Sequence, residues 1–153
     1  MFKGITYDYS SATVLVTGGT SGIGLACAQG YRDAGGDVII TRRKGGASDY
    51  DADLSNMTYI QLDVADRASL YALAGSLTQL DVLVNNAALY GGLKGARFEQ
   101  LDEAQWDAVM NINVKGLWQC CKAVVDPMRA AGGGSIINIS SLAAVYGLPY
   151  GMD

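Results

Sequence analysis

The stretch TVLVTGGTSGIG, residues 13–24, joins a short run of β-branched and aliphatic residues to the start of a helical pattern. The run TVLVT predicts a strand, and GIGLACAQGYRDAG, 22–35, predicts the helix that follows it. Gly18 permits a tight turn, Gly22 lets phosphate approach the backbone, and Gly24 lets the helix pack closely on the strand. Exposed amides at a helix start bind anions. The stretch therefore predicts a strand–turn–helix unit with a phosphate site. It is not a P-loop, because no Lys-Ser or Lys-Thr pair follows.

The rest of the chain alternates in the same way. Further strands are expected at 37–41, 57–63, 80–86 and 135–140, and further helices at 66–77 and about 102–131. Asp66 is the expected N-cap of the first of these helices. Pro127 should bend or end the second, for which a break near Gln105 is an alternative to one continuous helix. Strand–helix alternation with right-handed crossovers predicts a doubly wound α/β domain, in which ligands bind beyond the carboxyl ends of parallel strands.

Composition narrows the function classes. Half of the 153 residues are hydrophobic, enough for a sizeable core, and the net charge of −4 argues against a nucleic-acid or anionic-membrane surface. The absence of His removes the usual zinc triads and Ser-His-Asp chemistry. The three cysteines, Cys27, Cys120 and Cys121, have no metal spacing and are expected as helix-core thiols. No signal-peptide pattern or membrane-length apolar run is present, so we expect a soluble, cytoplasmic protein.

The pattern T-G-x-x-x-G-x-G in this setting resembles the short-chain dehydrogenase/reductase family, and later motifs agree in order. LDVAD carries Asp63, which matches the family aspartate that contacts adenine. NNAA, 85–88, resembles the family's Asn-Asn-Ala-Gly, with Ala88 in place of glycine. In WDAVMNINVKG, Asn113 matches the active-site asparagine, and in SIINISS, Ser141 matches the catalytic serine. The cofactor-binding residues implied by this resemblance and by the glycine turn are Gly18, Thr20, Ser21, Gly22, Ile23, Gly24, Asp63, Val64, Asn85 and Ala87.

The same residues also have purely structural interpretations. Asp63 could cap a helix or a turn, and Asn85 and Asn86 could satisfy backbone groups in a turn. Asn113 lies in a mainly apolar helix, where its amide needs a hydrogen-bonding partner of some kind. Trp106, Trp118 and Met128 are expected to be packing residues.

The end of the second predicted strand reads TRRK. An acidic residue about 20 residues beyond a glycine turn commonly binds the adenosine ribose hydroxyls, but here Arg42 holds that place and Arg43 and Lys44 follow. A cation would attract a 2′-phosphate, which favours NADP(H) over NAD(H). The alternative is a solvated basic loop.

The resemblance implies hydride transfer between nicotinamide and a carbonyl or alcohol carbon. In the family, a tyrosine transfers the proton, a lysine four residues later lowers its pKa, and the serine hydrogen-bonds the substrate oxygen. No lysine follows Lys122, and Tyr146 has Tyr150 in place of lysine four residues on. Loop packing is therefore the expected role of both tyrosines. We expect the catalytic tyrosine just past Asp153.

The chain is accordingly predicted to be one incomplete Rossmann-like domain, 1–153, with strand order 3-2-1-4-5, later strands missing and an exposed fifth strand that favours aggregation or pairing. The expected function is the cofactor-binding part of an NADP(H)-preferring oxidoreductase acting on a small carbonyl or alcohol, with little turnover by itself. A silent dinucleotide-binding module and an inert fragment are the alternatives, although a pure binder needs neither Asn113 nor Ser141. The helix from about Asp102 resembles one used for subunit pairing, which implies a homodimer or homotetramer of the complete protein. No nucleic-acid or membrane partner is expected.

Overall fold

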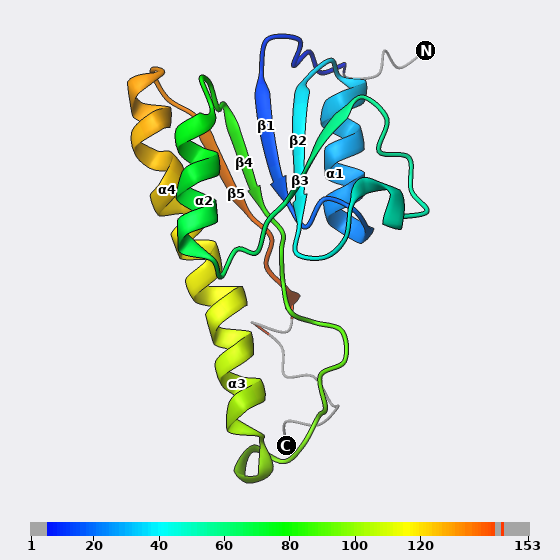
Figure 1. Ribbon diagram of the computed structural model, residues 1–153, viewed down its shortest axis with the longest axis vertical. Helices are drawn as coiled ribbons and strands as arrows, with labels where there is room; N and C mark the ends of the chain where they lie inside the picture. Colours follow the sequence, from blue (N-terminus) through cyan, green and yellow to red (C-terminus); the bar gives the residue numbers. More distant parts are fainter. Residues whose placement is uncertain (1–5, 143–144, 146–153) are drawn as a thin grey trace.

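A computed structural model describes residues 6–142 and 145 of the chain (Figure 1). Its centre is a parallel sheet whose strands are β1 (Thr13–Thr17), β2 (Asp37–Arg42), β3 (Met57–Gln61), β4 (Val82–Asn85) and β5 (Ser135–Asn138). The strand order is β3-β2-β1-β4-β5, which confirms the predicted doubly wound topology. In the register, Val16 lies beside Ile40 of β2 and Val84 of β4. All five carboxyl ends therefore meet at one edge of the sheet.

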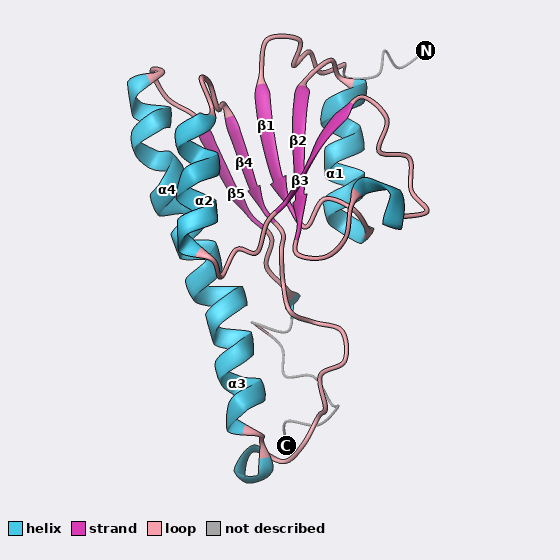
Figure 2. Cartoon of the chain, in the orientation of Figure 1, coloured by secondary structure: helices cyan, strands magenta, loops and turns pink. Residues whose placement is uncertain are grey.

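Helices cover both faces of this sheet, as expected (Figure 2). They are α1 (Gly22–Asp33), α2 (Arg67–Ser76), α3 (Glu103–Val109), the π-helical segment η3 (Met110–Gly116) and α4 (Leu117–Ala130), with short 3₁₀ turns η1 (Ala47–Asp49) and η2 (Phe98–Gln100). One core packs α2 and α4 against side chains such as Leu15 and Leu83. The other packs Ala28 of α1 against Val16 and Ile40. Strand residues alternate between the two cores, so the sheet is buried on both sides near its centre.

The long helix is continuous from Glu103 to Ala130, which agrees with the predicted range of about 102–131. It does not break near Gln105: the Asp102 carboxylate caps α3, and the Gln105 amide bonds both backbone groups of Lys94. Pro127 does not end it either, because α4 continues to Ala130. A proline so near a helix end removes only one late backbone bond, and buried Met128 still packs on the sheet core. The glycine run then closes the helix, with the Gly133 N–H donating to the Met128 carbonyl at 2.9 Å.

Two parts of the molecule lie beyond the packed centre. The segment α3 extends past the carboxyl edge of the sheet (Figure 1). Strand β5 forms an edge at which all four residues are exposed, as expected, and Ile136 and Ile137 retain 37% and 39% of their surface.

In the described part of the chain, no helix is long and apolar enough to cross a membrane.

Candidate functional site

The glycine turn after β1 requires glycine at three positions for three reasons. Gly18 has φ +68°, and a Cβ there would lie 3.0 Å from the Ala87 Cα. At Gly24 a Cβ would lie only 2.3 Å from the Asn86 Nδ2. Gly22 has φ +55° and no atom within 4 Å of the place its Cβ would occupy, so its conformation and not its packing demands glycine. The turn is thus closed against β4 and open at Gly22.

Asn86 holds this turn in place. Its Nδ2 donates to the carbonyls of Thr17 and Gly18, at 3.1 Å each. In the opposite direction, the Thr17 hydroxyl accepts from the backbone N–H of Asn86 and of Ala87, both at 3.0 Å. For Asn86, the structural interpretation of the NNAA motif is therefore confirmed: the amide satisfies backbone groups of a turn. The ends of β1 and β4 form one hydrogen-bonded unit.

Helix α1 begins differently from α2 and α3, which also start from loops. Asp66 caps α2 and Asp102 caps α3, each through its carboxylate, whereas Ser21 at the start of α1 makes no side-chain capping bond. The bonds from Ser69 and Ala68 hold the pKa of Asp66 below its ordinary value. The first turn of α1 also has no acidic residue. Its N–H groups and the positive end of its dipole are therefore available to an anion.

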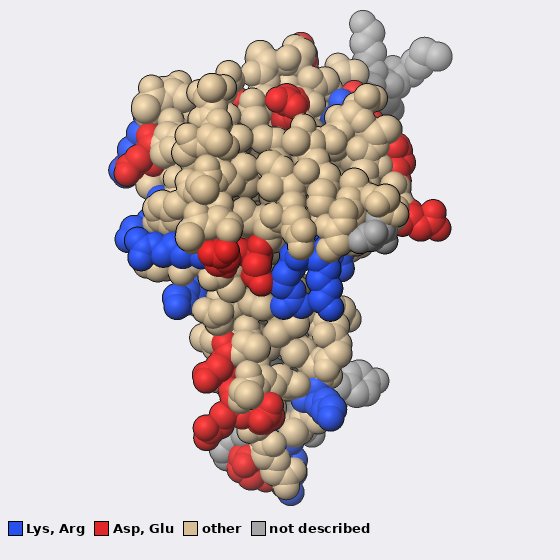
Figure 3. Space-filling model, in the orientation of Figure 1, with Lys and Arg blue, Asp and Glu red and all other residues tan. Residues whose placement is uncertain are grey.

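Arg42, at the end of β2, reaches across to this helix start. Its Nη1 donates to the Thr20 hydroxyl at 2.9 Å and to the Ser21 hydroxyl at 2.6 Å. Its guanidinium also lies over the ring of Tyr50, with Cζ 5.3 Å from the centroid. Arg43, the next residue, is exposed. Figure 3 shows Lys and Arg side chains gathered along the carboxyl edge of the sheet, with acidic side chains among them.

Asp63 and Val64 follow β3 at the same edge. The Asp63 Oδ1 accepts from the Ala65 N–H at 2.9 Å, so the carboxylate also shapes the turn, in line with the structural alternative. Val64 is 5% exposed and lies in the α2/α4 core. A Cβ at Gly116 would lie 2.8 Å from the Val64 Cγ2, so this glycine lets η3 pack against Val64. The side chain of Val64 is a packing group, and only its backbone remains for a ligand.

Asn85 is directed into the protein. It is 3% exposed, and its Nδ2 donates to the Asn138 Oδ1 at 2.9 Å and to the Cys121 Sγ at 3.2 Å. Its backbone carbonyl accepts from the Ile139 N–H. The side chain thus ties β4 to β5 and α4.

Asn113 and Ser141 belong to different segments of the chain. Asn113 lies in η3, and its amide pairs with both backbone groups of Leu89: Oδ1 accepts from the N–H at 2.7 Å and Nδ2 donates to the carbonyl at 3.1 Å. Ser141 lies three residues beyond β5 and is exposed. Tyr146 and Tyr150 lie outside the described residues. The structure therefore joins Thr20, Ser21 and Arg42 to one another and ties Asn113 to the loop after β4.

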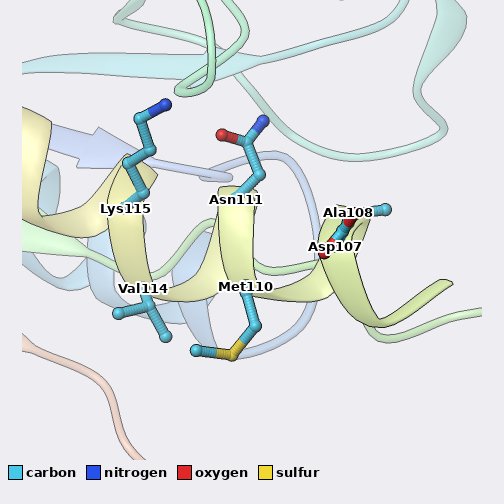
Figure 4. Close-up of a pocket in the computed structure, with 6 residues that line it drawn as sticks. All are labelled: Asp107, Ala108, Met110, Asn111, Val114 and Lys115. Atoms are coloured by element: carbon cyan, nitrogen blue, oxygen red, sulfur yellow. The ribbon is translucent and has the colours of Figure 1, made fainter. Parts of the chain in front are cut away.

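A separate hollow of about 620 Å³ lies on α3 and η3 (Figure 4). It is lined by Asp107, Ala108, Met110, Asn111, Val114 and Lys115. None of the predicted site residues lines it. We assign the candidate site to the carboxyl edge, where the glycine turn, the uncapped helix and Arg42 converge.

A sequence profile of the family described as short chain dehydrogenase matches residues 12–152. The chain belongs to this family. The members of the short chain dehydrogenase family are oxidoreductases that bind NAD(P)(H). The matched range spans the motifs quoted above, from the glycine turn to SIINISS.

Several short chain dehydrogenases are similar to the chain, at 32% to 37% sequence identity. The 3-oxoacyl-[acyl-carrier-protein] reductase FabG of Chlamydia trachomatis is 33% identical over 147 residues, covering 90% of this chain and 58% of the relative. A solved short chain dehydrogenase/reductase family protein superposes with a TM-score of 0.84 at 37% identity, covering 94% of this chain and 61% of that one. The structure described as the closed form of serine dehydrogenase complexed with NADP+ superposes with a TM-score of 0.79 at 32% identity. This match covers 89% of the present chain and 56% of the serine dehydrogenase chain. The chain thus spans about three fifths of the length of such relatives.

Proposed function

We propose that the chain forms the cofactor-binding part of an NADP(H)-dependent oxidoreductase that interconverts a small carbonyl compound and its alcohol. The observation that carries this proposal is the uncapped start of α1 behind an open glycine turn, with Arg42 bonded to its two hydroxyls. Both the backbone amides and the dipole of α1 suit a pyrophosphate. The nicotinamide supplies or accepts the hydride when the cofactor is bound.

In this proposal different residues around the turn bind different parts of the dinucleotide. The amides of Gly22, Ile23 and Gly24 bind the pyrophosphate, and Gly18 shapes the turn. Asp63 and the Val64 backbone lie beside the adenine. In this proposal Asn85 and Ala87 contribute by holding the loop after β4 in place. The buried Asn85 side chain bonds Asn138 and Cys121, and the Ala87 backbone amide bonds Thr17.

The preference for NADP(H) follows from the charge and hydrogen bonding at Arg42. A guanidinium matches a phosphate, and Arg43 adds a second positive charge nearby. The hydroxyls of Thr20 and Ser21 accept from Arg42, and that of exposed Ser21 keeps its own hydrogen to donate to a phosphate oxygen. In the described residues no carboxylate forms an ion pair with Arg42, so none of them neutralises its charge.

A titration tests this preference directly. Cofactor fluorescence gives the Kd of NADPH and of NADH for the protein and for Arg42→Asp, in which we expect the preference to reverse. Arg129→Asp is the matched control, because it makes the same charge change on α4, where Arg129 bonds Asp126. Unchanged relative affinities in Arg42→Asp would refute the assignment of NADP(H).

For the reaction itself, we assign the Ser141 hydroxyl as a hydrogen-bonding partner of the substrate oxygen. Transfer of hydride to a carbonyl leaves negative charge on that oxygen, which a positioned hydroxyl stabilises. Asn113 positions the loop after β4 through its two bonds to Leu89. Carbonyl-dependent oxidation of NADPH by the complete protein separates this enzyme from a silent dinucleotide-binding module.

We also propose that the protein pairs with a second copy through the long helix. Trp106, Met110, Val114 and Trp118 recur every fourth residue along α3, η3 and α4, and they remain 56%, 40%, 53% and 55% exposed. Neither tryptophan packs into the core of the chain itself, whereas Met128 is buried there as expected. The contiguous apolar stripe is typical of an interface.

Charge favours an antiparallel arrangement of the two copies. Lys122 lies over the Trp118 ring, with Nζ 5.2 Å from the centroid, near one end of the stripe. Asp102 and Glu103 lie at the other end, at the start of α3. In an antiparallel pair centred between Met110 and Val114, Lys122 of one copy comes beside these acids of the other.

A further inference from the structure

The loop that follows β2 is tied back onto the sheet by side chains of the loop itself and of β3. The Tyr59 hydroxyl, from β3, donates to the carbonyls of Gly45 at 2.7 Å and Lys44 at 3.1 Å. The amide of Gln61, also in β3, donates to the Arg43 carbonyl at 3.1 Å. The Tyr50 hydroxyl donates to the Lys44 carbonyl from within the loop. The loop after Arg42 is therefore held in one path, and Tyr50 is held with it.

This path places the Tyr50 ring over the Arg42 guanidinium. The Arg42 Cζ is 5.3 Å from the Tyr50 centroid, within the range of a cation–π interaction. The Tyr59 ring lies next to that of Tyr50, with 6.1 Å between their centroids and 40° between their planes. Tyr50 is half-buried.

Arg42 is consequently fixed in two directions. The hydroxyls of Thr20 and Ser21 hold its Nη1, and the Tyr50 ring lies against the planar group. Among the described residues, neither Nε nor Nη2 of Arg42 has a hydrogen-bonding partner, so these donors remain for a ligand. A long, flexible side chain that is already oriented loses less entropy when it binds a phosphate.

We propose that Tyr50 is a specificity-determining positioning residue, which fixes the Arg42 guanidinium for the 2′-phosphate of NADP(H). This inference rests on the NADP(H) preference proposed above. The inference assigns the positioning of Arg42 to the aromatic ring of Tyr50 and not to the Tyr50 hydroxyl, which bonds the Lys44 carbonyl. Tyr50 therefore changes the affinity for NADP(H) and not that for NAD(H), because NADH lacks the 2′-phosphate that Arg42 would bind.

Variants of the two tyrosines separate the ring from the loop bonds. Tyr50→Leu removes the ring, whereas Tyr50→Phe keeps the ring and loses only the bond to the Lys44 carbonyl. Tyr59→Phe is the matched control, because it loses loop bonds without touching Arg42. Arg42→Ala, alone and combined with Tyr50→Leu, completes a double-mutant cycle.

The readout is the ratio of Kd values for NADPH and NADH, measured by fluorescence titration of the same protein sample. This ratio does not depend on the fraction of protein that is folded. We expect Tyr50→Leu to weaken NADPH binding by roughly three- to tenfold, the size of a partly desolvated cation–π contact, and to leave NADH binding unchanged. Tyr50→Phe and Tyr59→Phe should keep the wild-type ratio. In the Arg42→Ala background, Tyr50→Leu should have no further effect.

Two results would overturn the inference while leaving the cofactor assignment in place. One is an equal loss for both cofactors in Tyr50→Leu; the other is no loss in Tyr50→Leu although Arg42→Ala weakens NADPH alone. If Arg42→Ala changes neither cofactor selectively, the cofactor preference and the role of Tyr50 both fail. Titration with 2′,5′-ADP and 5′-AMP gives the same comparison without the nicotinamide half, so the effect can be assigned to the 2′-phosphate.

Discussion

One amide group, that of Asn86, joins the two loops on which the proposed cofactor would rest. It bonds the carbonyls of Thr17 and Gly18 and occupies the space that a side chain at Gly24 would need. The glycine pattern of the sequence predicts the turn, because only glycine adopts the positive φ of Gly18 and Gly22 freely. The role of Asn86 could be predicted only as one of two alternatives, since an asparagine after a strand serves ligands and turns equally well.

The close contact between Gly24 and Asn86 gives a prediction at a single atom. In Gly24→Ala the new Cβ would lie 2.3 Å from the Asn86 Nδ2 and 2.5 Å from the Gly18 oxygen, so the amide must move. We expect a loss of about 1–3 kcal/mol in the free energy of unfolding, measured with urea, together with weaker NADPH binding.

Gly30→Ala, in the same helix, is the control for this variant. No atom lies within 4 Å of its Cβ position, and alanine is the better helix former, so we expect a gain of about 0.5–1 kcal/mol. Equal behaviour of the two variants would show that the contact with Asn86 does not constrain the turn.

Asn113 gives a second prediction at this scale. Its amide satisfies both backbone groups of half-buried Leu89, so Asn113→Ala should lower the free energy of unfolding by about 1–3 kcal/mol. Asn111→Ala, at an exposed position of the same π-helical segment, should have little effect. If the two variants unfold at the same urea concentration, the bonds to Leu89 do not stabilise the loop.

At the scale of elements, the capping pattern distinguishes α1 from its neighbours. The sequence predicts the Asp66 cap, because an acidic residue precedes a helical pattern there, and the structure confirms it. It also predicts all five strands, and the hydrophobic runs of β1, β2 and β4 suit the burial of both faces that the structure shows for these central strands. It does not predict the π-helical segment, and the possibility that Pro127 ends the long helix is wrong, because tertiary packing on the sheet overrides the local signals that would end or regularise a helix.

The uncapped start of α1 predicts opposite effects on stability and binding. Ser21→Asp places a carboxylate beside the positive end of the helix dipole, so it should stabilise the fold by about 0.5 kcal/mol. The same charge should weaken NADPH binding roughly tenfold by repelling the pyrophosphate. Thermal unfolding and fluorescence titration measure the two effects.

Asp66→Ala at the start of α2 is the comparison for this variant. It removes an existing cap and should lower the Tm without changing the affinity for NADPH. Unaltered NADPH affinity in Ser21→Asp would place the phosphate elsewhere.

At the scale of the whole molecule, the apolar stripe and the exposed edge strand predict self-association. Val114→Glu puts a charge at the centre of the stripe and should shift the protein toward monomer in sedimentation velocity. Asn111→Glu adds the same charge to the same segment, but its side chain points to the other side from Met110 and Val114 (Figure 4). It should leave the sedimentation coefficient unchanged. A wild-type protein that stays monomeric at all concentrations would contradict pairing through the helix.

The sequence predicts much of the site because its chemistry lies in contiguous motifs at strand ends, which a parallel sheet brings to one edge. It does not predict Tyr50, because the contact with Arg42 depends on how the intervening loop folds back on β3. Nor does it predict that both tryptophans of the long helix are exposed, since their spacing suits a buried face equally well.

The most direct test of the account is an NMR titration of backbone amides with NADPH. We predict that the largest shifts fall on residues 18–24, at the glycine turn and the start of α1, with a further shift at the side-chain Nε of Arg42. Shifts confined to other parts of the chain, or none at NADPH concentrations that saturate other members of the family, would contradict binding at this turn.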